Sequence, residues 1–237
     1  MVNIIRKTAL AAGFALVALG LTAASAATVT STSAALTSSD AGYSWTVDFI
    51  CSPSLPCNAS PTVELTARAV FTLTTVVINA STVSWGINLV LTNTSASGVG
   101  GALTAMGFNT DPDAVLSGIV DSAADGTVFS GGSGGAAGIP GYQTELCVWD
   151  GNNCQAANEK TMTAGEGNTM SFILTTAGLG TLLTFDNFAV KVAGAGLPQS
   201  YEFGGTIPAP VPLPAAGGFL LLGLGALVAL RRKQKSA

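Results

Sequence analysis

The sequence contains no histidine, and this absence removes much of the usual catalytic chemistry. A Ser-His-Asp triad, a Cys-His pair and the commonest type of metal ligand all require an imidazole. Paired carboxylates can run glycoside hydrolysis without histidine, so a hydrolase of that kind stays open as an alternative. The composition favours a protein that is not an enzyme, and we assign no catalytic residue, no metal and no cofactor.

Charged residues are scarce, and basic residues are nearly absent from the middle of the chain. Only 9% of the 237 residues are charged, whereas 48% are hydrophobic. Between residues 27 and 207 there are thirteen acidic residues and three basic ones, Arg68, Lys160 and Lys191, which gives this segment a net charge of −10. Because nucleic-acid binding depends on clustered Lys and Arg that release counterions, the sequence argues against a nucleic-acid partner.

The N-terminus has the three parts of a secretory signal peptide. Arg6 and Lys7 supply positive charge, an apolar run extends from Ala9 to Leu21, and small residues follow. Ala24 and Ala26 occupy the cleavage positions, so residues 1–26 are the predicted signal peptide and Ala27 begins the mature chain. The alternative is a short membrane anchor, although the run is shorter than the ~20 residues that span a bilayer.

The C-terminus combines a proline-containing motif, an apolar segment and a basic end. Residues 208–214 form a stiff spacer that ends in a VPLP motif, and residues 215–230 are apolar. Together with the motif, this length approaches the ~30 Å hydrocarbon core of a bilayer, which predicts one transmembrane helix. The positive-inside rule places residues 231–237 in the cytoplasm. The basic residues there are Arg231, Arg232, Lys233 and Lys235.

Two interpretations of this end remain open on physical grounds alone. A permanent single-pass anchor and a processed sorting tag would both have such a helix. Pro212 and Pro214 lack amide donors and favour an extended chain before them, which would leave the peptide accessible to a protease.

The string VPLPAAGGFLLLGLGALVALRRKQ resembles the VPLPA-CTERM domain, a variant of the PEP-CTERM sorting signals. The resemblance covers residues 211–237 only. It implies a Gram-negative source and processing by an exosortase, a membrane-embedded cysteine transpeptidase. It also implies an inner-membrane precursor that later reaches the outer surface or the medium. The residues that match the motif are Val211, Pro212, Leu213, Pro214 and Ala215.

Between the two targeting segments the sequence is typical of β-structure. Residues 82–93 alternate apolar and polar side chains, as a half-buried strand requires. Similar runs occur at residues 43–50, 63–78, 103–109, 144–149, 170–176, 182–185 and 188–192. Turn-forming clusters separate them, and no useful window has helical periodicity. We therefore predict an all-β ectodomain over residues 27–207, an antiparallel and jelly-roll-like β-sandwich.

Two sets of residues in the predicted loops could be interpreted as ligand-binding residues. Residues 131–135 are glycine-rich but lack the Lys-Ser/Thr pair of a phosphate loop, so a flexible loop is favoured. Four aspartates lie among turn-forming residues and are interpreted as turn residues. Calcium ligation is the alternative, because carboxylates and loop carbonyls suit this cation. These aspartates are Asp111, Asp113, Asp121 and Asp125.

Four cysteines agree with export to an oxidising compartment. Three pairings are possible, and we favour Cys51 with Cys57 and Cys147 with Cys154, because each pair brackets turn-forming residues. A four-cysteine zinc site is the alternative, but neither pair has the two-residue spacing of a zinc knuckle.

Two functional classes follow from the sequence. The first is a structural or matrix-associated surface protein, as the resemblance implies. The second is an adhesion module that binds carbohydrate or calcium, and extracellular polysaccharide is a candidate partner. Aromatic side chains exposed on one sheet would favour sugar binding. The orientation of Tyr43, Trp45, Trp149 and Tyr201 stays open, whereas Trp85 is expected in the core.

Overall fold

The structure is a computed structural model that describes residues 27–55, 57–121, 129, 131–134, 138–150, 153–155, 162–194 and 196–209. Within these residues the protein is all-β, with antiparallel strand pairing and no helix. The predicted signal peptide, sorting motif, transmembrane segment and basic tail lie outside the described residues, and Ala27 is the first residue described. No helix that could cross a membrane occurs in the described part of the chain.

Ten of the twelve strands in the described residues form one continuous path of hydrogen-bonded neighbours, in the order β7-β10-β5-β4-β3-β12-β11-β6-β9-β8. The short strand β2 pairs with β11 and with β1. The strands are β1 (Thr28–Val29), β2 (Ala34–Thr37), β3 (Ser44–Cys51), β4 (Leu65–Ile78), β5 (Thr82–Asn93), β6 (Ala102–Asp111), β7 (Ala114–Asp121), β8 (Gly131–Gly134), β9 (Leu146–Trp149), β10 (Gly167–Ala177), β11 (Leu182–Ala193) and β12 (Tyr201–Thr206).

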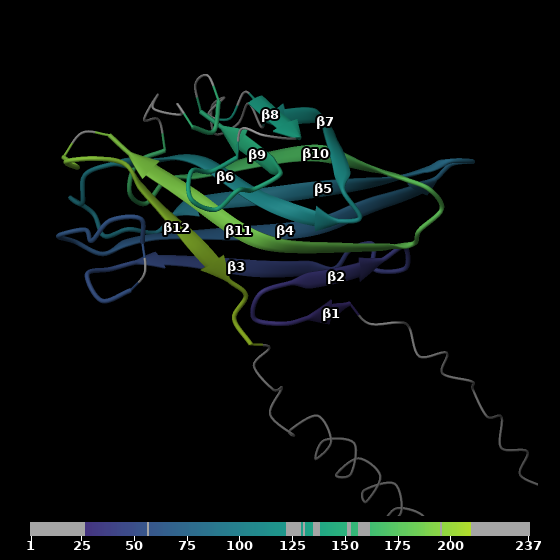
Figure 1. Ribbon diagram of the computed structural model, residues 1–237, viewed down its shortest axis with the longest axis horizontal. Helices are drawn as coiled ribbons and strands as arrows, with labels where there is room; N and C mark the ends of the chain where they lie inside the picture. The colour runs from purple at the N-terminus through teal and green to yellow at the C-terminus, as the bar shows by residue number, and fades with distance from the viewer. Residues whose placement is uncertain are drawn as a thin grey trace, which may run out of the picture.

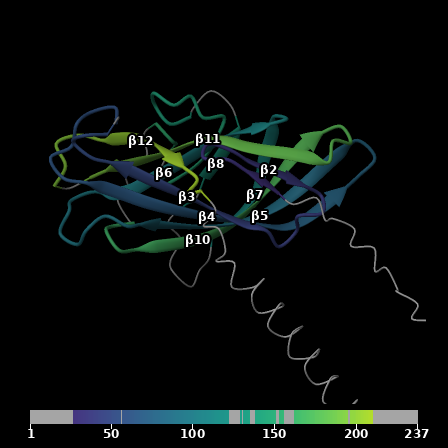
Figure 2. The same cartoon turned by 90° about the horizontal axis from the view of Figure 1, so that it is seen from below.

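The path folds over on itself, so that its two halves pack face to face in a sandwich-like arrangement (Figures 1 and 2). Aromatic rings join the halves across the core. Trp45 on β3 stacks on Phe71 at 4.9 Å between ring centroids and meets Phe185 on β11 at 5.0 Å. Phe71 meets Phe108 on β6 edge-to-face at 5.7 Å. One aromatic core therefore holds both halves together, which is the arrangement that alternating strands need to bury their apolar faces.

β12 connects the two halves at one edge. Its first residues pair with β11, from Tyr201 opposite Val192 to Gly204 opposite Ala189. Its last residues, Gly205 and Thr206, pair instead with Phe49 and Asp48 of β3. A Cβ on Gly205 would lie 2.5 Å from side-chain atoms of Phe49, so only glycine fits where the strand changes partners.

A second small core covers the outer face of β6 and β11. Residues 138–150 and 153–155, which we call the cap, contribute Ile139, Cys147 and Cys154 to it. Ala105 and Ala189 supply the sheet side of this core, where small side chains leave room for the cap. Consequently the run Phe188–Ala193 of β11 is buried on both faces, unlike the half-exposed β5.

The structure confirms most of the predicted strands and corrects three expectations. The runs 182–185 and 188–192 are one strand, β11, with a register shift at Asp186 and a positive φ of 48° at Asn187. The glycine-rich stretch expected to be a flexible loop contains β8, which pairs with β9. Two strands are also longer than expected, since β6 covers Ala102–Asp111 and β10 covers Gly167–Ala177.

Candidate functional site

A groove crosses the molecular surface where β12 meets β3. It encloses about 550 Å³ and is lined by Asp48 and Ile50 of β3, Leu55, Tyr142, and Gly204–Thr206 of β12. This volume falls within the ~300–1,000 Å³ typical of ligand sites. The lining therefore combines two loops that are far apart in sequence with the strand that joins the two halves of the fold.

The floor of the groove is formed by residues without side chains. Gly204 lies beneath the ring of Tyr142, and a Cβ there would be 3.1 Å from Tyr142 Cε1. A larger residue at this position would push the ring away or fill the space. The missing side chain at Gly204 thus leaves room for the Tyr142 ring at the groove.

One wall belongs to the loop closed by the Cys51–Cys57 disulfide. Leu55 lies in this loop, and Ile50 precedes it on β3; each is 46% exposed. Asn58, directly after the disulfide, fixes the loop through its backbone N–H, which donates to the Glu202 carbonyl at 3.1 Å. The apolar wall is therefore covalently and conformationally restrained.

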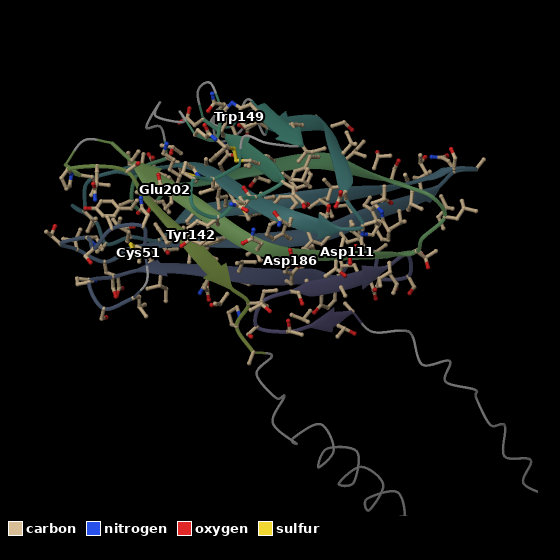
Figure 3. The ribbon with its side chains drawn as sticks, in the orientation of Figure 1. Cys51, Asp111, Tyr142, Trp149, Asp186 and Glu202 are labelled. Atoms are coloured by element: carbon tan, nitrogen blue, oxygen red, sulfur yellow. A yellow bond between two sulfur atoms is a disulfide. The ribbon has the colours of Figure 1, made fainter. Side chains whose placement is uncertain are left out.

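The opposite wall is Tyr142, which is half-buried at the edge of the cap (Figure 3). Its carbonyl accepts a hydrogen bond from Asn187 Nδ2 at 2.6 Å, and its N–H donates to the Ile139 carbonyl at 3.1 Å. The cap itself is closed by the Cys147–Cys154 disulfide. The two predicted local pairings are thus the ones present, and the Cys51–Cys57 disulfide closes the loop that forms the Leu55 wall.

The polar rim consists of Asp48 and Thr206. Arg68 Nε donates to Asp48 Oδ1 at 2.6 Å, and this hydrogen bond and the carboxylate charge raise the pKa of Arg68. On the other side of Asp48 a second hollow of about 440 Å³ continues along β3 to Tyr43. Asp48 therefore stands between two adjoining depressions, with its charge compensated by Arg68.

A pair of buried charges lies on β11 and β12, next to the strand residues that line the groove. Lys191 and Glu202 are register partners on β11 and β12, with 6% and 4% exposure. Burial lowers the pKa of Lys191, and the charge of Glu202 opposes this in part. Glu202 accepts hydrogen bonds from Asn58 Nδ2 and, at 2.9 Å, from Ser200 Oγ. Lys191 Nζ donates to the Gln155 carbonyl in the cap.

The three described aspartates of the four singled out from the sequence do not form a metal-binding group. Asp111 ends β6, Asp113 lies in the turn before β7, and Asp121 ends β7 rather than lying in a turn. Asp125 lies outside the described residues. Asp111 lies away from the end of the molecule where Glu202 and Cys51 are found (Figure 3). Among the described residues no three His, Cys, Asp or Glu side chains are grouped so that they could hold a metal ion.

The aromatic residues divide between core and surface. Trp45 and Tyr201 are buried, at 4% and 2% exposure, and Trp85 is fully buried as predicted. Tyr43 and Trp149 are half-exposed. The aromatic residue of the groove, Tyr142, was missed by the sequence analysis, because it lies in a Gly- and Pro-rich turn with no strand pattern.

The segments near the two ends of the described chain are hydrogen-bonded to each other. The Ile207 N–H donates to the Ser31 carbonyl at 2.9 Å, which fastens the segment after β12 to the segment after β1 (Figure 1). The described chain therefore begins and ends on the same side of the domain.

Comparisons with family models, with curated proteins and with solved structures find no match to this chain.

Proposed function

We propose that this chain is an exported surface or extracellular-matrix-associated structural protein, sorted through its C-terminal VPLPA motif and cleaved by an exosortase-type enzyme. In this proposal residues 1–26 are removed, residues 27–207 form the ectodomain, and residues 215–230 hold the precursor in the inner membrane. The proline motif, apolar segment and basic end at residues 211–235 carry the proposal. The hydrogen bond between Ile207 and Ser31 agrees with it, because it fastens the C-terminal end of the domain at one side. A domain held by one side presents the rest of its surface outward.

Two further features support export. Both disulfides belong to loops that shape the surface, and such bonds persist in oxidising compartments. The net charge of −10 over residues 27–207 favours solubility at a cell surface. The finer description of the domain as a jelly-roll-like sandwich is part of the proposal, and the packing of two layers around one aromatic core supports it.

A double substitution tests the sorting mechanism. Replacing Pro212 and Pro214 by Ala changes the motif but leaves the apolar segment and its basic end intact. A processed tag would then fail, and uncleaved precursor should accumulate in the inner membrane. A matched control replaces Pro198 and Pro208 by Ala, outside the motif, and should be processed normally. Equal processing of both double variants would contradict the sorting proposal.

A second candidate function is an adhesion module. The groove between β3 and β12 favours carbohydrate as the ligand, because it joins an aromatic ring to a carboxylate and a hydroxyl. For the calcium form, the decisive measurement is thermal unfolding with calcium or with a chelator. A calcium-dependent gain of more than ~3 kcal/mol, as expected at hundreds of times the dissociation constant, would favour calcium.

A further inference from the structure

The groove leaves apolar side chains in contact with solvent where the fold does not need them. Ile50 and Leu55 are each 46% exposed, and they face an open volume of about 550 Å³ rather than a packed surface. Ligand sites have this composition, with mostly apolar walls and a few fixed polar groups. The groove therefore has the size and lining of a binding site for a small or chain-like ligand.

We propose that this groove binds a linear, uncharged glycan, with Tyr142 and Leu55 against the apolar face of a sugar ring and Asp48 and Thr206 bonded to its hydroxyls. This inference deepens the carbohydrate form of the second candidate function and rests on it. It names the site and the class of ligand, and each follows from the chemistry of the lining.

The ligand must be amphipathic. A sugar ring presents C–H groups on its faces and hydroxyls around its edge. The groove offers the matching arrangement, because an aromatic ring and two aliphatic side chains form its walls while Asp48 and Thr206 lie at its rim. A carboxylate accepts hydrogen bonds from two neighbouring hydroxyls, and Arg68 holds the Asp48 carboxylate in place at 2.6 Å.

The ligand must also be uncharged. An anionic polymer would be repelled by a domain with a net charge of −10. A cationic ligand would find the one carboxylate of the groove already paired with Arg68. Hydroxyl groups can share Asp48 with Arg68, because an ionised carboxylate has about four acceptor positions.

The shape of the surface favours a chain over a single sugar. The groove and the second hollow share Asp48, and Tyr43 and Thr46 line the hollow beyond it. The outward-facing residues of β3 run from Ser44 to Ile50, which is about 20 Å at 3.3–3.4 Å per residue. An extended oligosaccharide can lie along this strand and contact both depressions.

The test measures binding of defined hexasaccharides to the full-length chain in mild detergent by isothermal titration calorimetry. The neutral probes are β-1,4-glucose, β-1,3-glucose, β-1,4-mannose and α-1,6-glucose hexamers, and an alginate hexamer is the charged probe. At least one neutral hexamer should bind and alginate should not. Tyr142→Ala should weaken binding roughly tenfold or more, whereas Tyr142→Phe should bind nearly as well as the wild type.

Leu55→Ser provides a second variant, because Leu55 is half-exposed in a disulfide-closed loop and its loss should not disturb folding. It should weaken binding severalfold. The matched control is Leu179→Ser, which removes another exposed leucine between β10 and β11, away from the groove, and should bind as the wild type does.

Three outcomes would overturn the proposal. The first is that no neutral hexamer binds, or that only alginate binds. The second is that Leu55→Ser and Tyr142→Ala both bind a hexamer as well as the wild type. The third is that Leu55→Ser dissociates an oligomer in light scattering without sugar, which would make the groove an interface between copies. Processing of the C-terminus is measured separately by mass spectrometry. A failure of the glycan-binding test therefore does not affect the sorting proposal, and a failure of the sorting test does not affect the glycan proposal.

Discussion

Lys191 and Glu202 lie directly opposite each other on β11 and β12, and each is bound by the residue that immediately follows the second cysteine of a disulfide. Gln155 follows Cys154 and accepts a hydrogen bond from Lys191, while Asn58 follows Cys57 and donates one to Glu202. The two disulfide loops thus meet on one pair of buried charges. This arrangement fixes the ends of both disulfide-closed loops to β11 and β12.

The Asn58 side chain is predicted to contribute about 2–4 kcal/mol to the free energy of unfolding. Asn58→Ala removes the donor to the Glu202 carboxylate and the acceptor for the Glu202 N–H at 3.0 Å, so two groups at a buried residue lose partners. Chemical denaturation of the two proteins measures the difference. Asn79→Ala, at an exposed turn between β4 and β5, is the control and should stay within about 0.5 kcal/mol of wild type. An equally small change for Asn58→Ala would contradict the role given to this residue.

Lys191 should make stability rise with pH in the alkaline range. Burial lowers its pKa below 10.5 in the folded protein, so between the folded and unfolded pKa values the unfolded chain binds more protons. The free energy of unfolding therefore increases as the pH rises through that window. Denaturation of wild type and Lys191→Met at stepped pH isolates this effect. The wild type should gain stability relative to the variant toward pH 10.5. A difference that stays flat or falls would show that Lys191 is not destabilised by burial.

Each disulfide is expected to close a local loop. Peptide mapping without reduction should show Cys51 linked to Cys57 and Cys147 to Cys154. Loops of this length correspond to about 2 kcal/mol of chain-entropy stabilisation, so replacing either pair by Ala should lower stability by at least that amount. Removal of the Cys147–Cys154 pair should cost more, because both of its cysteines are buried in the second core, whereas Cys57 is only half-buried. A cross-link between the two pairs would overturn this assignment.

Gly205 is predicted to tolerate no side chain. Gly205→Ala places a methyl group 2.5 Å from atoms of Phe49 and Val47, and such overpacking costs about 1–3 kcal/mol. Gly180→Ala is the matched control, since a Cβ at Gly180 meets nothing within 4 Å. Thermal unfolding should therefore separate the two variants clearly. If they melt alike, β12 does not change partners at Gly205 in the way described.

Much of the fold could be predicted because its long strands alternate apolar and polar residues in the sequence. β5 has the predicted bounds, since every second residue from Val83 to Asn93 is buried. The division of β11 into two was wrong, because polar Asp186 and Asn187 resemble a turn although a bulge keeps them in the strand. β8 and β12 were missed because glycines give no strand signal. Pairing with distant strands, not local preference, makes these segments extended.

The candidate site could be predicted only in part. Cysteine spacing indicated the two closed loops correctly, because short loops between turn-forming residues are easily bridged. Nothing in the sequence could bring Asp48, Leu55, Tyr142 and Gly204 together, since their proximity depends on β12 passing between the two halves of the fold. The four aspartates were considered as calcium ligands only because of their residue type and their turn-forming neighbours. Of those that the structure describes, Asp111 ends β6, Asp121 ends β7, and Asp113 lies between the two strands.

The most direct test of the account is the intact mass of the protein purified from its native host at several growth stages. We predict chains that begin near Ala27 and have lost the apolar segment after the VPLP motif, recovered from the outer envelope or the medium. If every chain instead ends at Ala237, the C-terminus is a permanent anchor and the sorting proposal is wrong.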